Sequence, residues 1–228
     1  MLKINCDIGE RGRAHPVDDK LMALIDIANI ACSGHAGDTS SINYYVDLAQ
    51  RNDVLITSHL SYPDRENFGR KKIALTDSAL IHSLDQQYQL LPSGKVKFHG
   101  ALYHESSHNP QLVPLIVKWL LANEVKVIIA PPQSLLAQQA TVQGIVVWHE
   151  GFIERGYRLI DGHLDLIPRG MSGAELTSIS AAVNQFEQLR TGCLLINNQP
   201  VTTRFDTACI HSDSEIALEL AQALKKRC

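Results

Sequence analysis

Polar, chemically active residues follow several apolar runs of this sequence at the point where each run ends. The run that ends at Ala31 is followed by Cys32, His35 and Asp38 in a glycine-containing turn. Histidines serve as general acids or bases and as metal ligands. A lone histidine at a strand end is more often structural, but several on one rim favour a functional role. Four histidines follow apolar runs in this way: His35, His59, His99 and His211.

An acidic loop closes the first apolar run, with Asp7 and Glu10 on either side of Gly9. Such a loop can bind a divalent cation or hold a general base, whereas the alternative is a solvated turn that caps a helix. The apolar run that leads into Asp7 favours function. The four histidines show no metal-ligand spacing, so a metal is left unassigned. If one is bound, the expected ligands are Asp7, His59 and His99.

Basic residues accompany these groups. Arg70 ends a long polar loop, and Lys97 stands two residues before His99. Arginine pairs with both oxygens of a carboxylate or phosphate, although a surface loop with internal ion pairs is the alternative. Cys32 could be a nucleophile, but a small buried cysteine is the favoured interpretation. The sequence has no nucleophile elbow, Walker A loop or dinucleotide fingerprint, which predicts no nucleotide site of its own.

Short, continuously apolar runs alternate with longer amphipathic segments, as in parallel strands buried on both faces and linked by helices. This pattern predicts a seven-stranded (β/α) barrel as a single domain over residues 1–228, with a doubly wound open sheet as the alternative because periodicity does not show closure. In a barrel the catalytic groups gather at the carboxyl ends of the strands. The predicted strands lie near residues 2–7, 27–31, 54–59, 95–99, 125–130, 145–149 and 207–211, and the predicted helices at 17–26, 39–51, 76–91, 109–122, 132–140, 174–190 and 214–226.

Two predicted β-hairpins interrupt this alternation. Residues 157–166 alternate around an Asp-Gly pair, which is a strong hairpin signal, and residues 194–202 form a weaker one. Asp38, Asn109 and Pro131 stand where helices are expected to begin.

Composition narrows the class of protein. The 228 residues carry a net charge of −3, which argues against electrostatic binding of nucleic acid. No apolar run reaches the length of a membrane span, and the first residues show no signal-peptide pattern. The five cysteines form no Cys-x-x-Cys pair, which fits a reducing compartment. We therefore expect a cytoplasmic protein without a membrane or nucleic-acid partner.

Taken in order, and over nearly the whole chain, these segments resemble the LamB/YcsF family. Each motif is weak alone, but together they are highly specific. The matching residues are Asn5–Glu10, Ala28–Cys32 with His35–Asp38, His59 with Tyr62–Asp64, Phe68–Arg70, Lys97 with His99–Tyr103, Glu150 with Phe152, Arg155 and Tyr157, Arg169, and Cys209–His211 with Asp213.

The resemblance implies a barrel of the glycoside hydrolase/deacetylase kind and a hydrolase acting on a cyclic amide. The implied reaction is the opening of 5-oxoproline (pyroglutamate) to L-glutamate by a 5-oxoprolinase, with ATP as co-substrate and two further subunits, B and C. The partners would activate the lactam carbonyl, and this barrel would hold the ring and assist its cleavage. The alternatives are a stand-alone metal-dependent amidohydrolase or deacetylase, and a non-catalytic paralogue that binds a small ligand.

Ring opening needs an activated carbonyl and a proton for the leaving nitrogen. We expect Asp7 to act as general base or metal ligand, while the catalytic histidines His35, His59 and His99 polarise the carbonyl or move protons. Lys97, Arg70 and Arg155 would hold a carboxylate or a transferred phosphate. The full set of predicted substrate-binding residues is Asn5, Glu10, Asn29, Asp38, Tyr62, Arg70, Lys97, Tyr103, Glu150, Arg155, His211 and Asp213.

Several positions that line the predicted pocket depart from the family pattern, so another small lactam or amide is an alternative substrate. Ser33-Gly34 replaces Gly-Phe, Leu60-Ser61 replaces Pro-Gly, Phe98 replaces proline, and Ser212 replaces glycine.

Overall fold

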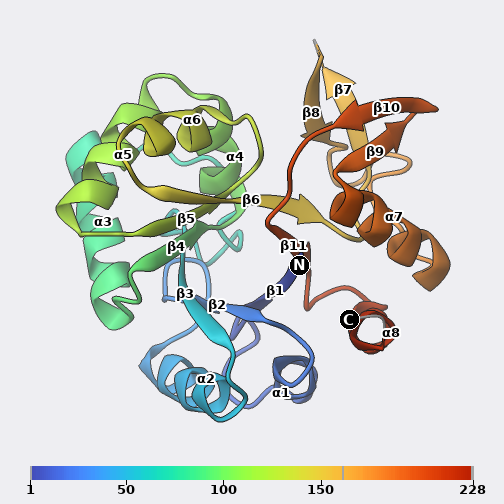
Figure 1. Ribbon diagram of the computed structural model, residues 1–228. Helices are drawn as coiled ribbons and strands as arrows, with labels where there is room; N and C mark the ends of the chain where they lie inside the picture. The colour runs from blue at the N-terminus through green and yellow to red at the C-terminus, as the bar shows by residue number, and fades with distance from the viewer. Residues whose placement is uncertain (1, 161, 227–228) are drawn as a thin grey trace.

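The computed structural model describes residues 2–160 and 162–226 and contains a closed barrel of seven parallel strands (Figure 1). The first strand closes the ring, because it pairs with the second strand on one side and with the last on the other. The predicted seven-stranded barrel is therefore confirmed, and the open-sheet alternative is wrong. The barrel strands, in the order of the ring, are β1 (Lys3–Ile8), β11 (Thr207–Ile210), β6 (Val146–Phe152), β5 (Val127–Ala130), β4 (Lys95–Phe98), β3 (Leu55–Leu60) and β2 (Ile27–Ala31).

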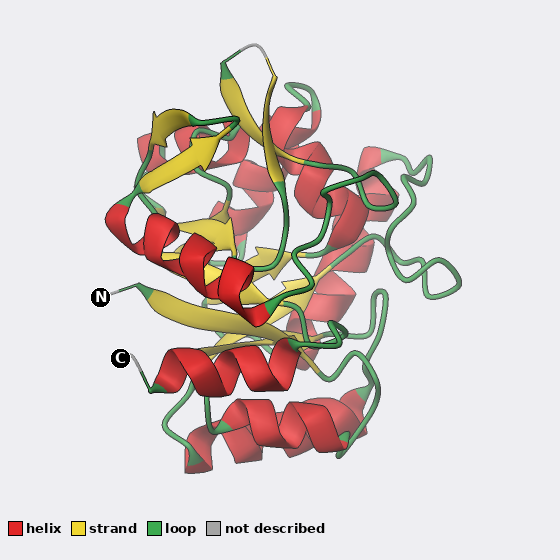
Figure 2. Cartoon of the chain, turned by 90° about the vertical axis from the view of Figure 1, so that its right-hand side faces the viewer, coloured by secondary structure: helices red, strands yellow, loops and turns green. Residues whose placement is uncertain are grey.

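Helices cover the outside of the barrel (Figure 2). Two of them, α4 and α5, follow β4 in succession, where the sequence predicts a single helix. Within the described ranges, no helix has both the length and the apolar character needed to cross a membrane. The helices are α1 (Pro16–Met22), α2 (Thr39–Arg51), α3 (Asp77–Leu90), α4 (Gly100–His108), α5 (Leu112–Ala122), α6 (Leu135–Val142), α7 (Ile179–Thr191) and α8 (Ala217–Lys225).

Both predicted hairpins are present between β6 and β11, and they lie together with α7 beside the barrel (Figure 1). The first consists of β7 (Tyr157–Ile160) and β8 (His163–Leu166), and the second of β9 (Cys193–Ile196) and β10 (Gln199–Thr202). Asp161, part of the Asp-Gly pair that predicts the first turn, lies outside the described residues.

Element boundaries follow side-chain capping. Asp38 caps α2 as expected, since its carboxylate accepts a hydrogen bond from Ser41 N. Asn109 stands two residues before the N-cap of α5, and its side chain accepts hydrogen bonds from the first free N–H groups of that helix. Pro131 does not begin α6, which is capped by Ser134 instead.

Apolar side chains pack in two clusters between the barrel and its helices, where their burial stabilises the fold. One cluster joins β1, β2 and β11 to α1, α2, α7 and α8, and the other joins β3, β4 and β5 to α3, α5 and α6. The inside of the barrel has a different composition from these apolar clusters. Branched aliphatic residues fill most (β/α) barrels, whereas buried polar residues from β1, β2, β3, β4 and β6 face one another here.

Candidate active site

The lowest layer of the barrel interior is a chain of hydrogen bonds between neighbouring strands. Asn5 Nδ2 donates to Thr207 Oγ1 at 2.8 Å, Asn29 Nδ2 donates to Asn5 Oδ1 at 2.8 Å, and Thr57 Oγ1 donates to Asn29 Oδ1 at 2.6 Å. The strand register sets Asp7 beside Asn29, which also donates to the Asp7 carboxylate. Asn5 and Asn29, predicted to bind substrate, therefore hold Asp7 in place from below.

A buried ion pair lies above this layer. The Lys97 ammonium is 2.8 Å from Asp7 Oδ1 and 2.9 Å from Glu150 Oε1, and all three side chains are buried. Burial alone would lower the pKa of Lys97, but the charge of Asp7 above all raises it well beyond its ordinary value. Burial also opposes ionisation of Asp7, yet His59 and Lys97 hold its pKa well below the usual range. Both groups are therefore charged at neutral pH.

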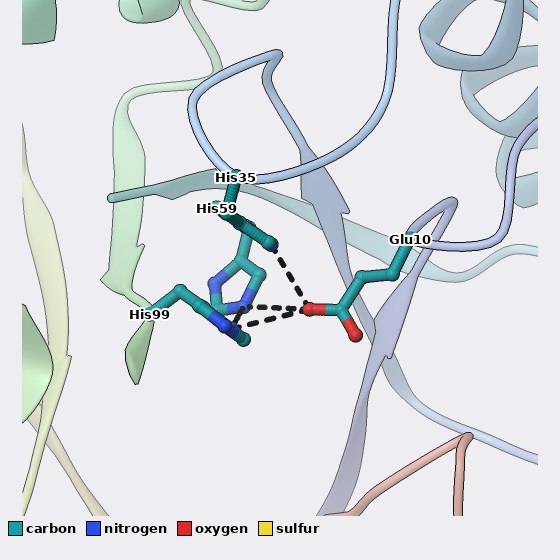
Figure 3. Close-up of side chains that lie close together, drawn as sticks. All are labelled: Glu10, His35, His59 and His99. Atoms are coloured by element: carbon teal, nitrogen blue, oxygen red, sulfur yellow. Dashed lines mark hydrogen bonds and ion pairs between the residues drawn. The ribbon is translucent and has the colours of Figure 1, made fainter. Parts of the chain in front are cut away.

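The second part of the site is a carboxylate surrounded by three imidazole rings (Figure 3). Glu10 Oε1 is 3.0 Å from His35 Nε2, 3.6 Å from His59 Nε2 and 3.2 Å from His99 Nδ1. The facing nitrogens of His59 and His99 are 3.1 Å apart. Asp7 Oδ2, at 3.4 Å from His59 Nε2, connects this cluster to the ion pair. The structure thus brings all four predicted catalytic residues together, with Glu10 at their centre.

Each histidine comes from the end of a different strand. His59 lies within β3, His99 is the N-cap residue of α4 directly after β4, and His35 stands in the turn after β2. Gly69 and Gly100 lack side chains, which lets the segments that carry His35 and His99 pack closely against the loop that contains Gly69. A Cβ on Gly69 would lie 2.9 Å from His35 Cβ, and a Cβ on Gly100 would lie 2.4 Å from the Gly69 carbonyl oxygen.

Burial and charge give the three rings different proton affinities. Burial lowers the pKa of His35 to about 3 despite its contact with Glu10, and burial also lowers that of His99. Burial lowers the pKa of His59 too, but the charge of Asp7 outweighs it and raises the value to about 9. Hydrogen bonds from the rings overcome burial at Glu10 and hold its pKa well below the ordinary range. With no other cation at the cluster, His59 carries the proton.

Two further predicted residues complete the wall beside Lys97. The Tyr103 hydroxyl and Glu150 are buried side by side, and their contact falls short of regular hydrogen-bond geometry. Burial, with the nearby charge of Glu150, raises the pKa of Tyr103 well above its ordinary value. Because buried polar atoms are almost always paired, these two are well suited to contact a ligand.

Glu154 is a site residue that the sequence analysis missed. Its Oε1 accepts hydrogen bonds from His211 N at 2.5 Å and from His211 Nδ1 at 2.7 Å, which fixes the predicted His211 ring. The two residues line a pocket that Asp213 also lines, and Asp213 pairs with Arg70 at 3.0 Å. The available signal is a second glutamate four residues after Glu150, directly behind the apolar end of β6.

Three predicted substrate-binding residues are engaged elsewhere. Asp38 is exposed and caps α2, and Tyr62 is buried in the apolar cluster near α3. The Arg155 guanidinium donates to the carbonyl oxygens of Ala174 and Ile167, and so ties the segment before α7 to β8. Its predicted pairing with an anion stays a prediction.

Two departures from the family pattern are in contact. A Cβ on Gly34 would lie 2.5 Å from Ser61 Oγ and 2.3 Å from Gln87 Oε1. Gln87 in turn bonds both the N–H and the carbonyl of Ser61. The small residue at position 34 therefore leaves room for Ser61 and Gln87, so these positions form one packing unit beside His35.

The fold and the buried acid–histidine–lysine cluster define a (β/α)-barrel protein with a polar centre at the carboxyl ends of its strands, the location of (β/α)-barrel active sites. The family model described as LamB/YcsF matches residues 2–228, and the chain belongs to that family.

Relatives of known name match along almost the full length. The A subunit of 5-oxoprolinase from Neisseria meningitidis serogroup C is 32% identical over 235 residues, covering 98% of this chain and 94% of the relative. The A subunit of 5-oxoprolinase from Pyrococcus abyssi is 32% identical over 237 residues, which cover 98% of this chain and 92% of the relative. Among solved structures, a lactam utilization protein from Thermus thermophilus matches with a TM-score of 0.84 and 27% identity. The match covers 99% of this chain and 94% of that protein. A putative chitinase A from Streptomyces coelicolor, with a TM-score of 0.55 and 10% identity, shares the fold alone.

Proposed function

We propose that this chain opens the lactam ring of 5-oxoproline to give L-glutamate, as one component of an ATP-dependent cytoplasmic complex with B and C subunits. The observation that carries the proposal is its near-complete alignment with proteins named as the A subunit of 5-oxoprolinase. The buried acids, imidazoles and ammonium at one mouth of the barrel are the groups that such a reaction needs.

The geometry supports a division of roles at the lactam. Asp7 Oδ2 is turned toward His59 rather than Lys97, and it is the carboxylate oxygen available as a general base. The cluster of Glu10 and three histidines can polarise the carbonyl, while the buried Tyr103 hydroxyl beside Glu150 can donate to a substrate oxygen. The proposed base and the polarising cluster meet at His59.

ATP would act through the partners. The sequence has no phosphate-binding loop, and Lys97 is already paired with two carboxylates, so this chain offers little to a triphosphate. The proposal therefore assigns carbonyl activation to the B and C subunits, and ring holding and cleavage to this barrel.

The test is a 5-oxoproline assay with ATP, in which glutamate is measured with and without the candidate B and C subunits. We expect glutamate only with the full set. Asp7→Asn should abolish turnover while the exposed Asp38→Asn keeps it. Turnover without ATP or partners would favour the stand-alone amidohydrolase, and no turnover in any combination would favour the non-catalytic paralogue.

A further inference from the structure

We propose that Glu10, His35, His59 and His99 bind one divalent transition-metal ion of the zinc class at the mouth of the barrel. Their four inward-facing ligand atoms all lie within 4.8 Å of one another. Three imidazoles and one carboxylate suit zinc, cobalt or a similar ion, whereas calcium and magnesium prefer oxygen ligands.

The spacing of the ligand atoms fits such an ion. Four ligands at about 2.0–2.1 Å from a tetrahedral zinc are separated from one another by about 3.3 Å. The separations from Glu10 Oε1 to the three ring nitrogens are 3.0, 3.6 and 3.2 Å, and that between His59 and His99 is 3.1 Å. Four of the six separations among the ligand atoms are thus close to those around a tetrahedral ion, and all six are within 4.8 Å.

The outer nitrogens determine which atoms face the centre. His59 Nδ1 is 3.1 Å from the Lys97 carbonyl oxygen, and His99 Nε2 is 3.0 Å from the Phe68 carbonyl oxygen. A carbonyl only accepts, so each outer nitrogen carries the hydrogen, and each inner nitrogen of a neutral ring presents a lone pair. Two lone pairs and a carboxylate oxygen then converge, an arrangement that a metal cation can balance in place of the proton on His59. Metal-binding histidines are commonly oriented by outer hydrogen bonds of this kind.

The third ring is oriented by packing. His35 stacks on His99 with ring centroids 3.7 Å apart, and its Nδ1 is buried without a hydrogen-bond partner among the described residues. Its Nε2 faces Glu10. Because the two rings are parallel, their in-plane lone pairs lie in separate planes, so His35 must rotate to join Glu10, His59 and His99 around one ion.

The balance of buried charges also supports a bound cation. The buried centre contains three carboxylates, Asp7, Glu10 and Glu150, against the single ammonium of Lys97. Buried charge is costly unless it is compensated. With neutral histidines the centre is short of two positive charges, which a divalent ion supplies. That ion would also provide a Lewis acid beside Asp7; this catalytic role rests on the proposed function, whereas metal binding does not.

The test uses the full chain, stripped with a chelator and titrated with Co²⁺, whose visible absorption reports its ligands. We expect saturation at one equivalent and displacement by Zn²⁺. Glu10→Gln, which keeps the shape of the side chain, and His59→Ala should each weaken binding at least tenfold, with circular dichroism confirming that both variants fold.

A matched control comes from a second group whose ligand atoms lie equally close, formed by the exposed His104 and His108 with the half-buried Asp165. The variant His104→Ala/His108→Ala should bind Co²⁺ as the unaltered chain does. The proposal is overturned if no Co²⁺ binds, if Glu10→Gln and His59→Ala bind it unchanged, or if the surface variant loses it. Because binding is read without substrate, a failure of the 5-oxoproline assay leaves this result intact.

Discussion

Replacing Lys97 by methionine removes the ammonium that faces both Asp7 and Glu150 while keeping most of the buried side-chain volume. Lys97 is 2% exposed, so water cannot take the place of its charge. Asp7 keeps the hydrogen bond from Asn29, but Glu150 loses the cation at 2.9 Å. Removing one partner of a buried ion pair costs about 3–5 kcal/mol. For a chain of this size, that loss lowers the melting temperature by about 6–20 °C.

Urea unfolding followed by circular dichroism measures this loss directly. The double variant Lys97→Met/Glu150→Gln should recover part of it, because one of the two stranded carboxylates is then neutral. The control is Lys72→Met, since Lys72 is 63% exposed in its pair with Glu105 and should change the free energy of unfolding by at most about 1 kcal/mol. The reasoning is refuted if Lys97→Met matches Lys72→Met, or if the double variant is no more stable than the single one.

Three further variants test other parts of the site. The first concerns His35, whose pKa near 3 in the folded chain lies below its ordinary value of about 6.5 in the unfolded chain. As the pH falls, the unfolded chain therefore binds this proton first, and in the presence of a chelator the free energy of unfolding should fall by about 2 kcal/mol from about pH 6.5 to about pH 5. His35→Asn should lose that part of the pH dependence in urea titrations, and an unchanged pH dependence contradicts the lowered pKa of His35. Gly100→Ala places a Cβ 2.4 Å from the Gly69 carbonyl oxygen at a φ of +57°, and should destabilise the fold by about 2 kcal/mol or more in thermal melts, whereas wild-type stability would disprove the close approach. Glu154→Ala leaves two His211 donors without their acceptor and should lower the free energy of unfolding by about 2–4 kcal/mol. A decrease below about 0.5 kcal/mol would exclude this role of Glu154 in holding His211.

The strand ends of this fold are predictable because parallel strands buried on both faces have a distinctive composition. The apolar runs that lead into Asp7, His59 and His99 locate three sides of the centre. Strand periodicity also explains why Asn5 and Asp7 share the inner face. Barrel closure then brings these residues together, as expected for carboxyl ends that meet at one mouth.

Other features depend on contacts between distant segments. The sequence does not predict helix α4, since residues 100–108 have weak apolar periodicity and pack through few side chains. Nor does the sequence show that Glu10 rather than Asp7 faces the three rings. That outcome follows from Gly9, whose φ of +80° turns the chain so that Glu10 extends over the mouth.

Tyr62 and Asp38, predicted to bind substrate, are engaged in structural contacts. Both stand close to histidines in the sequence, yet one packs in the apolar core and the other caps a helix. Proximity along the chain is a poor guide in loops, where one residue step can reverse the direction of a side chain.

The position of β1 between β2 and β11 has a consequence for how the molecule is made. During synthesis, the first six barrel strands can pair only as an open sheet, with β1 and β6 as its unprotected edges. The ring is sealed when residues 207–210 leave the ribosome and insert between those edges. A nascent chain halted before that point lacks a closed ring and exposes two edges to other chains. Assembly of the polar centre and protection of the sheet edges therefore depend on the same closing strand.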